Sequence, residues 1–178
     1  MKTFAVLAAA VIGIGSNISL EPTSKVWVEG TSSVRGFKCN AADISSAITT
    51  SGSTDIVSLV DDAQVTIPVA KLDCGNGTMN EHMRKALKSA QSPNIEFKLD
   101  SYKIEGTTAT LLGTLQIAGT TKSIEIPGTV QQEGNLVRVK ASKQINMTQW
   151  GVKPPSLMMG TMKVKENVTV GFDVTLKP

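Results

Sequence analysis

The chain has 178 residues, with 18 Lys and Arg against 15 Asp and Glu, which gives a formal net charge of +3. Its lysines are scattered along the sequence, so we expect neither a nucleic-acid-binding surface nor a polybasic membrane patch. The single histidine, His82, has no second histidine with which to form a metal site and no triad pattern around it. We therefore expect His82 to be structural or solvent-exposed, and the protein not to be an enzyme.

Residues 1–16 form a predicted signal peptide. Lys2 provides the positive start, residues 4–14 the apolar segment, and the residues around Gly15 a cleavage zone of small side chains. The apolar run is too short to be a permanent transmembrane helix, so an uncleaved anchor is the less favoured alternative. We expect a periplasmic or secreted protein whose residues 17–178 form one domain without an integral membrane span.

The first part of this domain is predicted to form short strands. Apolar and polar residues alternate in 25–29, 34–41 and 63–72, with the period of a half-buried strand. Pro68 lies inside the third segment, and because proline cannot donate to a strand ladder we expect an edge strand or a bulge there. The segment 43–54, rich in Ser, Thr and Ala, is either a weak edge strand or a loop.

One amphipathic helix is predicted over about residues 79–90. Its apolar stripe at helical spacing consists of Met79, Met83, Ala86, Leu87 and Ala90. Thr78 and Glu81 fit a capping box at the start, and Pro93 ends the helix. Because short isolated helices are marginal in water, the stripe must be buried. We expect the helix to be a lid or plug on the strands.

The rest of the chain is predicted to form consecutive antiparallel strands. The first of them, 95–104, changes phase near Asp100, which predicts a bulge or a strong bend. Further strands joined by short Gly-containing turns follow at 109–117, 122–130, 136–145 and 164–176. The total of about eight strands with apolar faces favours an all-β fold, an eight-stranded antiparallel barrel.

The chain has two cysteines, Cys39 and Cys74. In an exported protein a solitary pair of this kind predicts a disulfide. The two thiols and His82 lack the spacing of metal ligands, so we expect no metal site and no cofactor.

Three segments resemble the YceI-like family of exported polyisoprenoid-binding proteins. They are M-N-E-H-M-R-K-A-L-K followed by P-N-I-E-F, then G-T-L-Q-I-A-G-T-T-K-S-I-E-I-P, and the terminal strand after Trp150-Gly151. The resemblance covers nearly the whole mature chain. It implies a lipocalin-like barrel whose apolar interior takes a long isoprenoid or related lipid.

The candidate ligand-binding residues are the helix stripe, bulky residues of the strands and a Met-rich loop near the C-terminus. They are Phe37, Met79, Met83, Leu87, Phe97, Leu99, Leu115, Ile117, Trp150, Leu157, Met158, Met159, Met162 and Phe172. Methionine side chains are flexible and suit irregular apolar partners, although the loop could equally close the barrel or pack under the helix.

The hypothesis is a carrier for a long apolar small molecule such as a polyisoprenoid or prenyl quinone. The alternative is an interaction or stress-protective module with a filled barrel, and the sequence is compatible with a dimer. An enzymatic function is the weakest of the three interpretations.

Overall fold

The structure is a computed structural model that describes residues 16–178 apart from residue 54. The predicted signal peptide lies outside the described residues except for Ser16, which begins the first strand. The strands are β1 (Ser16–Leu20), β2 (Lys25–Ser32), β3 (Gly36–Ala41), β4 (Ser45–Thr50), β5 (Val60–Pro68), β6 (Leu72–Asp73), β7 (Asn94–Glu105), β8 (Thr108–Ile117), β9 (Thr120–Glu133), β10 (Leu136–Asn146), β11 (Ser156–Leu157) and β12 (Met162–Lys177). The helices are α1 (Gly77–Ala86) and the short 3₁₀ turns η1 (Ile56–Ser58), η2 (Val69–Lys71), η3 (Met147–Trp150) and η4 (Met158–Gly160).

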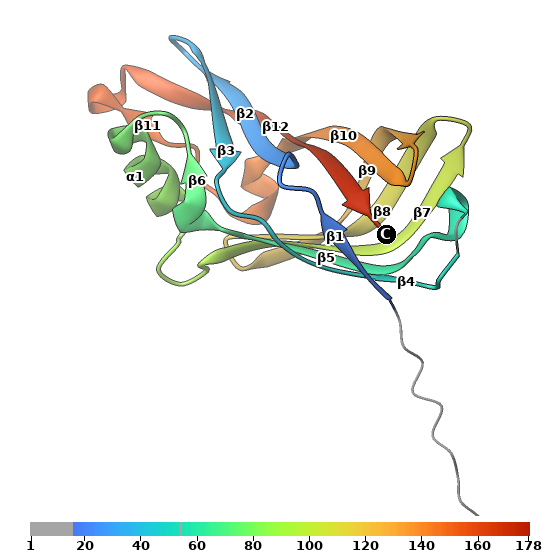
Figure 1. The fold of residues 1–178 in the computed structure, drawn as a ribbon. Helices are drawn as coiled ribbons and strands as arrows, with labels where there is room; N and C mark the ends of the chain where they lie inside the picture. Colours follow the sequence, from blue (N-terminus) through green and yellow to red (C-terminus); the bar gives the residue numbers. More distant parts are fainter. Residues whose placement is uncertain (1–15, 54) are drawn as a thin grey trace, which may run out of the picture.

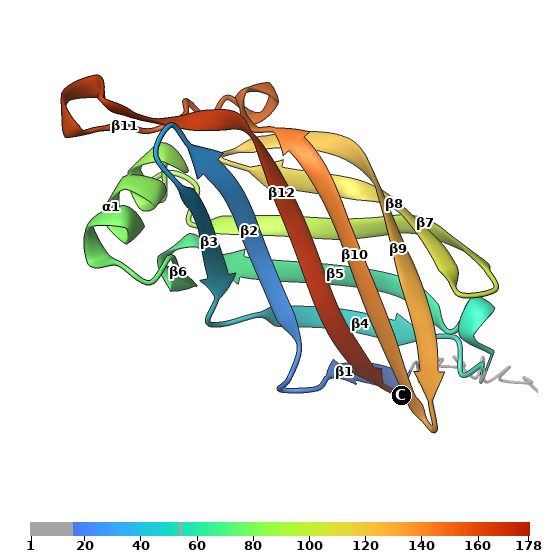
Figure 2. The ribbon, with the colours of Figure 1, turned by 90° about the horizontal axis from the view of Figure 1, so that it is seen from above.

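The strands close into an eight-stranded antiparallel barrel, as predicted. β1 continues into β2, β3 into β4 and β5 into β6, so that each of these pairs forms one side of the ring. The two strands of one such side pair with the two strands of the next side: β2 pairs with β3, and β1 pairs with β4. β7 pairs with β5, and β8, β9 and β10 each pair with the strand before them. β12 pairs with β10 and closes the ring by pairing with both β2 and β1, while the short β11 pairs only with β12 (Figures 1 and 2).

The turn between β8 and β9 is a two-residue hairpin. Both of its residues have positive φ, 50° at Ala118 and 81° at Gly119. This is the twist that tight antiparallel hairpins prefer, and glycine adopts it without strain.

The predicted irregularity near Asp100 is confirmed, because the β7–β8 register shifts between Leu99 and Ser101. Next to it, Gly113 of β8 leaves room for an aromatic ring: a side chain there would meet the ring of Phe97 at 2.8 Å and the carbonyl of Lys98. The phase change and this glycine therefore serve one purpose, which is to let β7 and β8 bend together around the barrel.

Two features of the first half of the domain differ from the prediction, and one segment that was left undecided is now assigned. Pro68 is the last residue of β5, a strand that lies between β4 and β7, so it is neither on an edge nor in a bulge. The end of a strand tolerates proline because the ladder needs no further donor there. The undecided segment 43–54 contains β4, and β1 was not predicted because its few residues offer too short a pattern.

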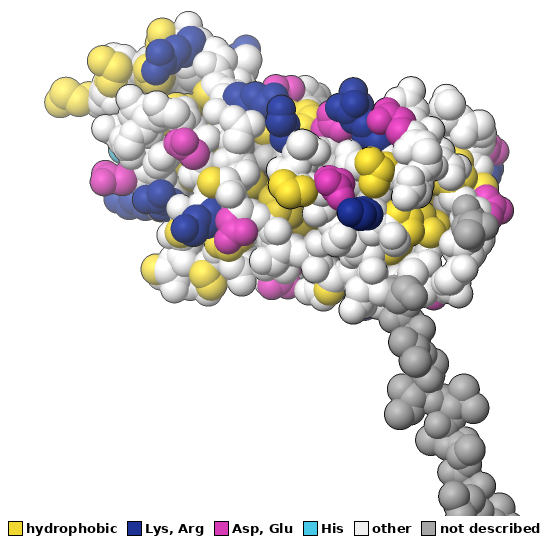
Figure 3. Space-filling model, in the orientation of Figure 1, with side chains coloured by type: hydrophobic (Ala, Val, Ile, Leu, Met, Phe, Trp, Pro, Cys, Tyr) yellow, Lys and Arg dark blue, Asp and Glu magenta, His cyan; other side chains and the backbone are white. Residues whose placement is uncertain are grey.

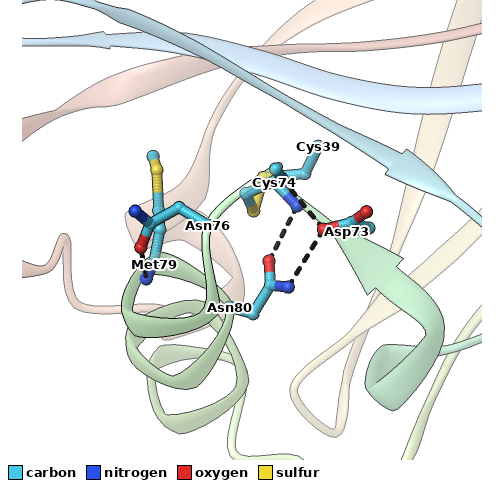
Figure 4. Close-up of a disulfide and its surroundings, with 7 residues drawn as sticks. Cys39, Asp73, Cys74, Asn76, Met79 and Asn80 are labelled. Carbon is cyan, nitrogen blue, oxygen red and sulfur yellow. Dashed lines mark hydrogen bonds between the residues drawn. A yellow bond between two sulfur atoms is a disulfide. The ribbon is translucent and has the colours of Figure 1, made fainter.

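The helix is shorter than predicted and begins earlier. α1 covers Gly77–Ala86, with Leu87 as its C-cap, and the chain then turns at Lys88, whose φ is 54°. The stripe therefore does not extend to Ala90. The start is also capped differently: the side chain of Asn76, not that of Thr78, accepts a hydrogen bond from the Met79 N–H at 3.2 Å (Figure 4). Asparagine is among the best N-cap residues, and here it precedes the predicted box.

Two groups of buried side chains lie along the barrel. One, around Leu115, Ile126 and Trp150, occupies the half nearer α1. The other includes Ile18, Ala109 and Leu176 and fills the opposite end, beside η1. We refer to the two ends as the helix end and the far end (Figure 1).

Candidate ligand cavity

A cavity of about 310 Å³ occupies the barrel interior. Its lining is almost entirely aliphatic and aromatic, and no charged side chain contributes to it among the described residues. The strand alternation predicts this, because inward positions such as Val65 and Ile67 of β5 share one face while Gln64 points outward. Side chains from both groups of core residues line the cavity.

Two titratable side chains, Tyr102 and His82, line the cavity. The Tyr102 hydroxyl accepts a hydrogen bond from the Val60 N–H at 3.1 Å, so this oxygen already has one hydrogen-bond partner in the barrel wall. An apolar lining with a few polar groups is the usual composition of a small-molecule site.

Helix α1 covers one end of the cavity. Met79, His82, Met83 and Leu87 all contribute to the lining, yet no residue of α1 is fully buried. Figure 2 shows the helix beside the ends of β3 and β6. The apolar face of the helix is thus turned toward the cavity, and Leu87 also packs against the core. That the helix acts as a lid stays a prediction.

A second cavity, of about 330 Å³, lies at the helix end and we call it the vestibule. It is bounded by the β2–β3 turn, the start of α1 and the hairpin of β11 and β12. Polar side chains such as Arg35, Asn76 and Thr78 line it together with apolar ones. Residues that line both spaces form the neck between them: Phe37, Met79, His82, Leu157 and Val164.

Most of the candidate ligand residues lie on these two spaces. Those on the main cavity are Phe37, Met79, Met83, Leu87, Phe97, Leu99, Leu115, Ile117, Leu157 and Phe172. Met158 and Met162 line only the vestibule. Met159 lines neither and is fully exposed at 105 %. Trp150 is buried in the core, where its Nε1–H donates to the Leu115 carbonyl at 2.9 Å, and it does not reach the cavity.

Sequence reasoning missed two polar residues of the lining. His82 was expected to be structural or exposed, but it lies at the neck. Its position three residues after Met79, on the same side of the helix, was the available signal. Tyr102 becomes an inward residue because the bulge changes the phase of β7.

The predicted disulfide between Cys39 and Cys74 is present. It joins β3 to the segment that immediately precedes α1 (Figure 4). Beside it, Asn80 of the helix accepts a hydrogen bond from the Cys74 N–H at 2.7 Å and donates one to Asp73 at 3.0 Å. That bond and a second from the Gly75 N–H hold the pKa of Asp73 below its ordinary value. The start of the helix is therefore tied to the barrel by covalent and polar links.

The described part of the chain contains no cluster of three or more His, Cys, Asp or Glu side chains arranged to hold a metal ion. Within residues 16–178, no helix has both the length and the apolar character that crossing a bilayer requires.

Comparison with known families decides the classification, because the model of the YceI-like domain matches residues 17–176. The chain belongs to the YceI-like family. A comparison with curated protein sequences found no match.

Several solved structures share the fold. The chain is similar to BcnA of Burkholderia cenocepacia, with a TM-score of 0.74 and 18% identity over 88% of this chain and 99% of the other. For a polyisoprenoid-binding domain from Saccharophagus degradans the TM-score is 0.67 and the identity 14%, over 90% and 97% of the two chains. A YceI protein of Campylobacter jejuni gives 0.64 and 19%, over 77% and 82%.

Proposed function

We propose that this protein is an exported carrier that binds one long apolar molecule, such as a polyisoprenoid or a prenyl quinone, inside the barrel without covalent chemistry. The observation that carries the proposal is the cavity of about 310 Å³ with no charged side chain on its described lining. Burial of apolar surface is non-directional and scales with area, so a chain-shaped ligand can be held by shape with few polar contacts.

Two further observations support the proposal. The Saccharophagus degradans domain, which has a similar fold, is described as polyisoprenoid-binding. The Cys39–Cys74 disulfide is the kind of bond that persists in oxidising compartments, which agrees with a periplasmic or secreted location.

The direct test is organic extraction of the purified protein followed by mass spectrometry. We expect one class of long-chain apolar molecule in the extract. The delipidated protein should then bind an added prenyl quinone, observed as a change in tryptophan emission.

A matched pair of variants separates binding inside the barrel from adsorption on its surface. Ala63 lines the cavity, whereas Ala47, on the neighbouring strand β4, is exposed. Ala63→Phe should lower the affinity because it fills part of the cavity, and Ala47→Phe should leave it unchanged. Equal affinities in the two variants would refute binding in the cavity. An extract without lipid, together with no binding by the delipidated protein, would favour the alternative of an interaction module.

A further inference from the structure

Two neighbouring turns at the helix end present large apolar side chains to solvent. Met158 and Met159 in η4, between β11 and β12, are 72% and 105% exposed, and Val34 in the β2–β3 turn is 66% exposed. We call these three residues the apolar tip. Figure 3 shows hydrophobic side chains projecting from this end of the molecule, at the upper left.

The two turns are held together. The Ser33 N–H donates to the Lys163 carbonyl at 2.9 Å, and the Ser33 hydroxyl donates to the Thr161 carbonyl at 3.2 Å. The Lys163 N–H in turn donates to the Ser33 hydroxyl at 3.1 Å. The apolar tip is therefore a single surface formed by two hairpins that are hydrogen-bonded to each other.

The methionine turn has a backbone conformation that is unfavourable for the residues it contains. Met158 and Met159 have φ values of 53° and 57°, in the left-handed region that glycine or asparagine occupies with less strain. Two methionines at such positions gain no burial in the barrel in return, which points to a role outside the folded domain.

The two segments that form the apolar tip carry basic charge, and Glu166 follows directly after the second of them. The segments 31–38 and 151–165 carry Arg35, Lys38, Lys153, Lys163 and Lys165 and no acidic residue. Lys163 and Lys165 are exposed and lie two residues apart on β12, so they share its outer face. In Figure 3, basic side chains lie directly beside the projecting hydrophobic ones. Exposed apolar side chains flanked by Lys and Arg match the chemistry of a bilayer surface that contains anionic lipids.

The same surface is the rim of the route to the cavity. Met158 lines the vestibule as well as projecting into solvent, and Arg35 lines it from the other turn. Leu157 and Val164, which continue from the tip along β11 and β12, form part of the neck. An apolar path thus leads from the apolar tip to the barrel interior.

We propose that the apolar tip inserts into a lipid surface bearing anionic headgroups, and that its basic flank holds it there. The vestibule then faces the acyl layer, so that a long apolar ligand can pass between bilayer and cavity without crossing water. The purpose of this docking rests on the proposed carrier function, but docking itself is measured without any ligand.

The experiment is co-sedimentation of the delipidated protein with vesicles of phosphatidylcholine containing phosphatidylglycerol, and with vesicles of phosphatidylcholine alone. We expect binding to the anionic vesicles that weakens as salt is added. The double variant Met158→Ser/Met159→Ser should lower the partition coefficient at least about ten-fold, because two apolar side chains no longer enter the membrane. Lys163→Gln should lower it roughly five-fold.

Each change has a control at the far end of the barrel. Val57 in η1 is also an exposed apolar residue, at 54%, and Lys177 is an exposed lysine at the end of β12. Val57→Ser and Lys177→Gln should bind vesicles as the wild type does. Circular dichroism and melting temperature confirm that all variants are folded.

The outcomes separate this proposal from the proposed function. Wild-type protein that stays in the supernatant, or a methionine double variant that binds as well as wild type, overturns the docking proposal. So does a dimer that forms without vesicles and is dissociated by the same double variant, because the apolar tip would then be a contact between two copies. Lipid extracted from the double variant by organic solvent shows that the cavity still binds its ligand. Vesicle binding by a protein that never takes up lipid would instead contradict the carrier function alone.

Discussion

Removal of the Cys39–Cys74 disulfide is the most quantitative test of how the helix end is held. The two cysteines are 35 residues apart in sequence, and on the chain-entropy relation a cross-link of that span stabilises the fold by about 4 kcal/mol. Cys39 is only 1% exposed and lines the cavity, so replacement by alanine adds a packing loss to the entropic one. The double variant Cys39→Ala/Cys74→Ala should therefore be less stable than wild type by at least this amount.

Urea unfolding followed by circular dichroism measures the effect. With a slope of about 2 kcal/mol per M, the midpoint should fall by roughly 2 M. Wild type kept in a reductant serves as a second form without the cross-link. Because it retains the Cys39 side chain, its midpoint should fall slightly less than that of the double variant. A midpoint shift below about 0.3 M would refute the argument that this loop is flexible in the unfolded chain.

The effect should also be local. The disulfide lies directly before α1, and Asn80 is hydrogen-bonded to the Cys74 backbone. Amide hydrogen exchange in residues 77–86 should therefore accelerate more in the double variant than exchange in β8 and β9. Uniform acceleration along the chain would mean that the disulfide stabilises only the fold as a whole.

Two further predictions concern the lid and the barrel wall. Leu87→Asp should lower stability by about 3 kcal/mol, because a carboxylate replaces a leucine packed against the core, whereas Leu112→Asp on an exposed position should change the melting temperature little. The Arg138 guanidinium makes two hydrogen bonds to Asp173, at 2.8 and 2.7 Å, and these hold the pKa of that carboxyl below its ordinary value. The resulting stabilisation is complete above the pKa of Asp in the unfolded chain, about 3.9, and is lost as pH falls through the lower pKa of the folded state. Asp173→Asn should therefore be less stable than wild type at pH 7, and the difference should disappear in acid once the pH is below the lowered pKa of the folded state. A difference that persists there would assign the effect to packing.

The sequence predicted those parts of the fold that have a local pattern. The period of two in the later strands, the phase change near Asp100 and the solitary cysteine pair each follow from a short stretch of residues, and each is confirmed. The helix was predicted as an element, but its ends were wrong. Both Asn76 and the capping box that begins at Thr78 are plausible helix starts in the sequence, and the structure uses Asn76. At the other end, the chain turns at Lys88 with positive φ, where the sequence has no glycine to indicate a turn.

The features that depend on distant residues were not predictable in this way. β1 has too few residues to show a period, and it is a strand because β4 and β12 supply its partners. Trp150 was grouped with the Met-rich loop because of its place in the sequence. In the structure its indole N–H donates a hydrogen bond to a carbonyl of β8, and the ring packs into the core. The vestibule is formed by three separate segments, so no single stretch of sequence could reveal it.

The closure of the barrel has a consequence for how the protein acquires its cavity. The last strand, β12, joins β10 to β2 and β1, so the ring is completed only by residues at opposite ends of the domain. A chain emerging from a ribosome or a translocation pore can form the hairpins from β7 to β10 in sequence, but their apolar faces stay uncovered until the final 16 residues arrive. Contacts of such long sequence separation form slowly, which leaves a period in which those faces are open to aggregation. Folding helpers that shield half-built sheets would therefore matter more for this protein than for a helical bundle of the same length.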